Sequence, residues 1–180
     1  FYSSHDLRRD GALGQGWNLP YGSQLRLDRG ATGEPVVVLI DTQGREVELP
    51  DLEPGSHQLC LREGLDLCRS EGGHYFIHVP GGLFYLFEAP ADAARNGQLL
   101  KLARVEDRNG NFIDLRHDAL GRLVAMTDGT GRLLALDYTG ESPRLDAVRI
   151  AVGAPGESPG LLVRYRHDDH GRLAEVTDRN

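Results

Sequence analysis

A short phrase recurs in the second half of the chain, with a turn between two apolar stretches. Residues 118–123 read Asp-Ala-Leu-Gly-Arg-Leu, residues 168–173 read Asp-Asp-His-Gly-Arg-Leu, and residues 142–145, Ser-Pro-Arg-Leu, are a degraded copy. A sequence that repeats at a fixed period indicates one supersecondary unit stacked on its neighbours. The repeat therefore constrains the fold more than any single motif does.

The spacing of the repeat predicts its structure. Asp107 and Asp128 are 21 positions apart, and so are Gly110 and Gly131. This period is shorter than the roughly 30 residues of a βαβ unit, but it suits two strands and two turns. A loop rich in glycine, proline and serine at 151–160 explains why the full phrase returns only after 50 positions. We therefore predict consecutive antiparallel hairpins.

The residues between the expected strands are those that tight turns need. Asp107 and Asp128 each begin an Asp-x-x-Gly sequence, in which the carboxylate can accept hydrogen bonds from its own backbone. The glycines at its fourth position tolerate a positive φ. Gly121 and Gly171 are expected to serve the turns at the opposite ends of the strands.

These patterns predict an all-β fold, a ribbon of consecutive antiparallel hairpins. We expect a less regular β region at residues 1–98 and the repeats at 99–180. Residues 36–40 and 45–49 are expected to form one hairpin and residues 74–79 and 83–87 another, and the best helix candidate is 91–96. Gly14 and Gly16 precede the single tryptophan, Trp17, which predicts a tight bend packed on an indole that anchors a core.

Composition excludes several classes of function. The net charge is −7, and the cations are scattered arginines with the single lysine Lys101, so a basic nucleic-acid-binding face is not expected. No apolar run approaches 18 residues, so we expect no membrane span. Because the chain opens with Phe1 and its one methionine is Met126, we expect a piece of a longer protein without a signal peptide.

The two cysteines, Cys60 and Cys68, lie in near-duplicate pieces of sequence. If residues 63–65 form a three-residue hairpin loop, the two thiols face each other and a disulfide can form. Two cysteines in 180 residues are no disulfide framework, however, which favours free thiols.

Three groups of residues could carry chemistry, and each has a plainer structural interpretation. His74 and His78 share one face of a strand, but no third metal ligand lies near them in the sequence. Residues 107–111 are rich in oxygen ligands, but their glycine is at position four, where a calcium loop needs it at six. Residues 167–170, His-Asp-Asp-His, occupy the turn position of the repeat. We therefore predict no catalytic residue, no metal site and no cofactor, and a structural role for Gly14, Gly16, Trp17, Asp107, Gly110, Gly121, Asp128, Gly131 and Gly171.

The motifs and their order resemble those of the Rhs/YD-repeat proteins, at the start of their β-cage. Residues 1–4, Phe-Tyr-Ser-Ser, and 13–17, Leu-Gly-Gln-Gly-Trp, are similar to the family's entry motif, and residues 105–111 and 118–123 to its repeats. His117 and His167 stand where the family usually has tyrosine. The entry motif looks most like the versions behind a tip domain in type VI secretion effectors.

The resemblance implies that the ribbon is curved and spirals as a segment of a shell, and that the shell encloses a C-terminal toxin. It further implies a protein made in the cytoplasm and secreted by a bacterium, with type VI secretion as the expected route. The implied partners are the rest of the shell, the enclosed toxin and, through an upstream region, secretion tip proteins and a chaperone. The toxin and the self-cleaving site of the family lie downstream. The alternative is a secreted or cell-surface module that binds carbohydrate or a partner protein. Since an isolated ribbon exposes strand edges, above all near Val176, we also expect association through them.

Overall fold

A computed structural model of the chain describes residues 10–90, 93–94 and 96–179. In these residues the chain is an all-β protein. Strand pairs are antiparallel throughout these residues, and none of them is helical. This confirms the predicted fold class. The helix candidate at 91–96 lies largely outside the described residues, and the opening residues 1–4 lie wholly outside them. A helix long and apolar enough to cross a membrane is likewise missing from the described part.

The described residues form two compact units. One contains the residues up to Pro20 together with those from Ile113 onward, and the other contains Tyr21–Phe112. The sequence pattern divides the chain at a different place, into residues 1–98 and 99–180, and that division stays a prediction. The structure groups the N-terminal segment with the repeats because Ala12 accepts a hydrogen bond from the backbone of Leu145, 2.8 Å away, and neighbouring residues contact Arg144.

The unit of residues 21–112 is built on a long strand that belongs to two sheets. Its strands are β3 (Gln24–Arg29), β4 (Pro35–Ile40), β5 (Glu46–Pro50), β6 (His57–Cys60), β7 (Leu65–Arg69), β8 (Tyr75–Val79), β9 (Leu83–Phe87) and β10 (Gln98–Asp107). The first part of β10 pairs with β3 and the rest with β9, with a shift in register between Leu102 and Arg104. Tyr75, Phe87 and Leu102 are fully buried in the core of this unit. The two hairpins predicted here from the sequence are confirmed.

The two cysteines do not face each other. In the β6–β7 hairpin, Cys68 lies opposite His57 and Cys60 lies opposite Leu65. The condition for a disulfide, a three-residue loop at 63–65, is not met, because β6 ends at Cys60 and the connection spans residues 61–64. Both thiols are free.

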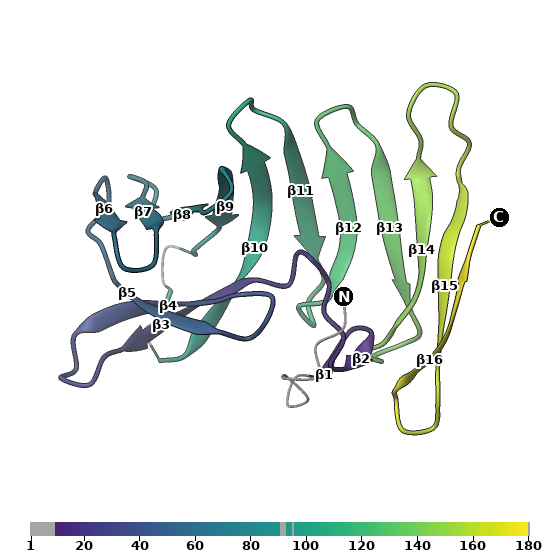
Figure 1. The fold of residues 1–180 in the computed structure, drawn as a ribbon, viewed down its shortest axis with the longest axis horizontal. Coiled ribbons are helices and arrows are strands. Elements are labelled where there is room, and N and C mark those ends of the chain that lie inside the picture. Colours follow the sequence, from purple (N-terminus) through teal and green to yellow (C-terminus); the bar gives the residue numbers. More distant parts are fainter. Residues whose placement is uncertain (1–9, 91–92, 95, 180) are drawn as a thin grey trace. The chain divides into compact units, whose positions relative to one another are not determined.

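The other unit is a meander of hairpins preceded by a small N-terminal hairpin (Figure 1). Its strands are β1 (Asp10–Gly11), β2 (Gly14–Gln15), β11 (Phe112–His117), β12 (Leu123–Asp128), β13 (Leu133–Tyr138), β14 (Leu145–Val152), β15 (Gly160–His167) and β16 (Leu173–Asp178). From β11 to β16 each strand pairs with the next. The core of this unit includes Leu115, Leu136 and Leu145.

Two hairpins of the meander are equivalent residue by residue. In β11–β12, His117 pairs with Leu123 and Leu115 with Met126, with a bulge after Arg116. In β15–β16 the same pairs and the same bulge occur 50 positions later, with His167 opposite Leu173. The sequence repeat is therefore a repeat of strand register.

Candidate functional site: the turns and their arginines

One five-residue turn recurs along the chain. It begins with aspartate at 41, 107, 118, 128 and 168, and the backbone N–H of its fourth residue donates to the carbonyl of its first. In all of these turns the aspartate Oδ1 accepts from the backbone N–H groups of the third and fifth residues, at 2.8–3.0 Å. The fourth residue is glycine with φ between 71° and 86°, as in Gly110 and Gly171. This is a type I turn followed by a left-handed residue, a common three-residue hairpin loop.

These hydrogen bonds favour the charged form of the aspartates. The backbone N–H of Arg172 is the main reason that the pKa of Asp168 falls to about 2. The pKa of Asp118 is lowered chiefly by the backbone N–H of Arg122, and those of Asp107 and Asp128 by side-chain hydrogen bonds from Asn111 and Thr130. The turns are therefore charged at neutral pH, and their carboxylates serve the local backbone.

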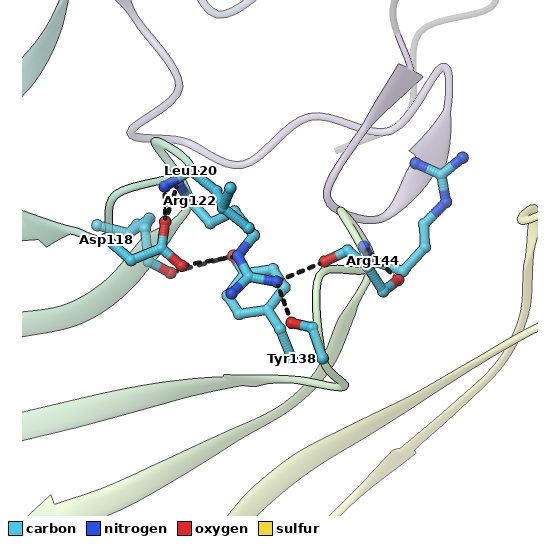
Figure 2. A network of polar contacts seen from close by, with 8 residues as sticks. Asp118, Leu120, Arg122, Tyr138 and Arg144 are labelled. Carbon is cyan, nitrogen blue, oxygen red and sulfur yellow. Dashed lines mark hydrogen bonds and ion pairs between the residues drawn. The ribbon is translucent and has the colours of Figure 1, made fainter.

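Arg122, the last residue of the β11–β12 turn, links that turn to the next one on the same edge of the meander. Its Nε donates to Asp118 Oδ2 at 2.7 Å. Its Nη1 donates to the carbonyls of Gly140 and Ser142, both at 2.8 Å, in the β13–β14 turn (Figure 2). The guanidinium is thus surrounded by acceptors from both turns.

Tyr138, the last residue of β13, completes this network. Its ring lies against the guanidinium of Arg122, with 4.8 Å from the guanidinium carbon to the ring centroid (Figure 2). Its hydroxyl donates to the carbonyl of Leu123 at 3.0 Å. Burial raises the pKa of Tyr138 to about 12, so the hydroxyl keeps its proton. The tyrosine therefore ties the end of β13 to the start of β12.

Arg144, in the degraded copy of the phrase, makes a second link on this edge. Its Nε donates to the carbonyl of Gly171 in the β15–β16 turn at 2.8 Å. Its Nη1 donates to the carbonyl of Gly11 at 2.8 Å, and its Nη2 contacts the carboxylate of Asp10 at 2.6 Å. One side chain thus holds the N-terminal hairpin against two turns of the meander.

Two predicted structural residues come together at this point. Gly14 has φ of 94°, and a Cβ placed on it would lie 2.9 Å from the carbonyl of Gly171. Such a contact is too short for a real side chain, so Gly14 allows the hairpin to approach the turn. Gly16 also has a positive φ, which agrees with the predicted bend, but the side chain of Trp17 is only partly buried. Full burial of the indole is therefore not observed, and its anchoring role stays a prediction.

The other predicted residues lie where the turn chemistry places them. Asp107 and Gly110 occupy the turn after β10, Asp128 and Gly131 the turn after β12, and Gly121 the turn after β11. How much each contributes to stability stays a prediction.

Each of the three groups weighed for chemistry contains residues that make structural contacts. Both carboxylate oxygens of Asp107 accept hydrogen bonds within its own turn, and Asp168 is held in the same way. His74 accepts a hydrogen bond from the backbone of Ala89 at 3.2 Å, and His78 stacks on Phe84 with 4.5 Å between ring centroids. These contacts support the structural interpretations.

Sequence reasoning missed Arg122, Tyr138 and Arg144 as the residues that link the turns. The signal was present, because arginine follows the turn glycine at positions 122, 132 and 172 and stands in the degraded copy at 144. What the local pattern does not contain is the acceptor, which is a backbone carbonyl in another turn.

The fold and these linked turns define an antiparallel β-repeat protein. Comparison with known proteins agrees: residues 95–133 match the family described as RHS Repeat, and residues 1–49 match a domain of unknown function, DUF6531. The chain belongs to the Rhs/YD-repeat proteins, as the motifs predicted.

Two relatives are toxins by name. The double-stranded DNA deaminase toxin A of Burkholderia cenocepacia is 32% identical over 180 residues, which is 100% of this chain and 12% of that protein. The toxin protein Tse5 of Pseudomonas aeruginosa is 30% identical over 221 residues, with 95% of this chain and 15% of that protein covered. This chain therefore corresponds to a small part of each relative.

Proposed function

We propose that this segment is a non-catalytic part of the wall of an Rhs shell, which encloses a C-terminal toxin for delivery by a bacterial secretion system. The observation that carries the proposal is the linkage of the turns. Arg122 and Arg144 use their charges to hold backbone carbonyls of neighbouring turns, and the turn aspartates hold their own backbone. Side chains used in this way stabilise a sheet.

The relatives support the connection to toxins. Both are named as toxins, and this chain covers 12% and 15% of their lengths. Most of each relative lies outside the part that matches this chain, which leaves room for the rest of a shell and for an active domain. The proposed partners are the remaining shell and the enclosed toxin, with secretion tip proteins and a chaperone reached through an upstream region. Type VI secretion is the proposed route.

A proteolysis experiment on the parent protein tests enclosure. The double variant Arg122→Gln and Arg144→Gln removes both links on one edge, so we expect the C-terminal region to be cut faster by protease. Arg108→Gln is the matched control, because Arg108 is an exposed arginine in a turn of the same type. If deletion of residues 10–179 from the parent protein leaves the protection of the C-terminal region unchanged, this segment is not part of an enclosing wall.

A second candidate function is a binding module for carbohydrate or a partner protein. Phe76 on β8 and Phe84 on β9 are exposed large apolar side chains, and His78 stacks on Phe84. Aromatic side chains exposed on a sheet face can pack against a ligand. A glycan array probed with the chain and with Phe84→Ser tests this function, and an array with no hits removes the carbohydrate version.

A further inference from the structure

We propose that His167 makes the attachment of the N-terminal hairpin, β1–β2, sensitive to pH. The hairpin is held on the meander while the imidazole is neutral, and it is released when His167 takes up a proton in mildly acidic solution. This switch goes beyond the proposed function, because it changes how one part of the segment holds another and does not depend on what the segment encloses.

His167 lies beside Arg144, the residue that holds the hairpin. It is the last residue of β15, and β15 pairs with β14 so that Arg164 lies opposite Ala147. Three positions further along β15 and three positions back along the other strand, the same register brings His167 opposite Arg144. The charge of Arg144 accordingly acts on the imidazole of His167.

The N-terminal hairpin packs on the turn that His167 begins to form. A Cβ on Gly14 would lie 2.9 Å from the carbonyl oxygen of Gly171 and 3.2 Å from the backbone nitrogen of Leu173. Leu173 is the strand partner of His167, and the carbonyl of Gly171 also accepts from Arg144 Nε at 2.8 Å. The hairpin, the arginine and the histidine therefore meet on one turn.

The environment of the imidazole suits its neutral form. The Nε2 atom of His167 is buried, and within the described residues it has no hydrogen-bond partner. A neutral imidazole can leave this nitrogen without a proton, whereas an imidazolium carries a proton on both nitrogens. A buried N–H group without an acceptor costs free energy, and so does a buried charge. The closed turn therefore disfavours the protonated ring.

The charged groups around the ring do not reverse this preference. Burial is the main reason that the pKa of His167 lies below its ordinary value of 6.5, and the charge of Arg144 lowers it further. The carboxylates of Asp146 and Asp168 act in the opposite direction, but both already accept hydrogen bonds from other groups. Asp10, on the hairpin, contacts Arg144.

The direction of the pH effect follows from the lowered pKa. A histidine with a lower pKa in the closed state stabilises that state above its ordinary pKa of 6.5, and the stabilisation is lost as the pH falls below that value. Protonation adds a second positive charge beside Arg144, which holds the carbonyls of Gly11 and Gly171. The imidazolium is hydrated only when the groups around it separate. Release of the hairpin separates them, because the hairpin is attached through Arg144 and Gly14.

One backbone amide reports the attachment directly. The N–H of Leu145 donates to the carbonyl of Ala12, in the hairpin, at 2.8 Å. In the unsubstituted chain we expect the hydrogen-exchange protection of this amide, corrected for the intrinsic effect of pH, to fall several-fold between about pH 7.5 and about pH 5. The midpoint of the fall should coincide with the titration of the His167 ring, followed by NMR in the same samples. Protection that stays level, or that falls at a pH where His167 does not titrate, overturns the proposal.

Two variants separate His167 from other groups that titrate. His167→Gln cannot take up a proton, so the protection of the Leu145 amide should stay level over this range. His170→Gln is the matched control, because His170 is an exposed histidine of the same turn, and its protection should fall as in the unsubstituted chain. The amides of β11–β12, a hairpin of the same register, should keep their protection in all three chains. The proposal is also overturned if His167→Gln retains the fall, if His170→Gln abolishes it, or if β11–β12 loses protection in parallel.

Discussion

Replacement of Arg144 by glutamine should release the N-terminal hairpin from the meander. Arg144 donates to the carbonyls of Gly171 and Gly11 and contacts the carboxylate of Asp10. Glutamine is shorter and uncharged, so it cannot reach all of these groups. The carbonyls then lose a charged donor at a place where the backbone of Gly14 packs closely on Gly171.

The magnitude follows from the separate contacts. A hydrogen bond that involves a charged group contributes roughly 1.5–3 kcal/mol. The contact with Asp10 adds little, because the Asp10 side chain is 58% exposed and such ion pairs contribute about 0–1 kcal/mol. The two carbonyl contacts therefore dominate, and with partial replacement by water we expect Arg144→Gln to cost about 2–4 kcal/mol.

Urea unfolding followed by the fluorescence of Trp17 is the appropriate assay, because this tryptophan is the only one in the chain and lies just after the hairpin. Arg166→Gln is the matched control. Arg166 forms an ion pair with Glu175 in which both side chains are more than half exposed, so its loss should change stability by less than about 0.5 kcal/mol. If the urea midpoint of Arg144→Gln coincides with that of Arg166→Gln, the hairpin is not held by Arg144.

Three further predictions concern single positions. Gly14→Ala should lower the thermal stability of the chain clearly more than Gly131→Ala. Both glycines have a positive φ, but of the two only Gly14 has backbone atoms where a Cβ would lie. Equal losses of stability in the two variants would contradict the close approach of Gly14 to Gly171. Because the folded-state pKa of Asp168 is about 2, below its ordinary value of 3.8, its contribution is present above pH 4 and is lost as the pH falls toward 2. Asp168→Asn should therefore flatten the fall of the urea midpoint in that window, and an unchanged slope would argue against the turn hydrogen bonds. Light scattering should show association of the isolated chain through its exposed β16 edge, and Val176→Lys should reduce it; a chain that is monomeric at all concentrations would refute this.

The hairpins could be predicted because their determinants are local. An aspartate and a glycine three positions later satisfy the backbone of one turn within five residues, as the turns at Asp118 and Asp128 show. Strand alternation and the spacing between turns then set the period. The register of the cysteines could not be predicted, since a loop of four residues in place of three moves Cys60 away from Cys68.

The links between turns could not be read from the sequence in the same way. Arg122 shows as a recurrent arginine, but its acceptors are carbonyls 18 and 20 positions further along. A carbonyl is present at every position, so no residue type marks which one is used. The same holds for Arg144, whose acceptor at Gly11 is 133 positions away.

The amino-acid sequence alone determined that this protein is a ribbon of antiparallel hairpins of the Rhs/YD-repeat family, because turn residues act on their immediate neighbours and their spacing is visible in the chain. Only the tertiary structure decided how the ribbon is held along its edge: which carbonyls Arg122 and Arg144 bind, and why Gly14 must be small. Those contacts join residues that are distant in sequence, and they exist only once the strands lie side by side.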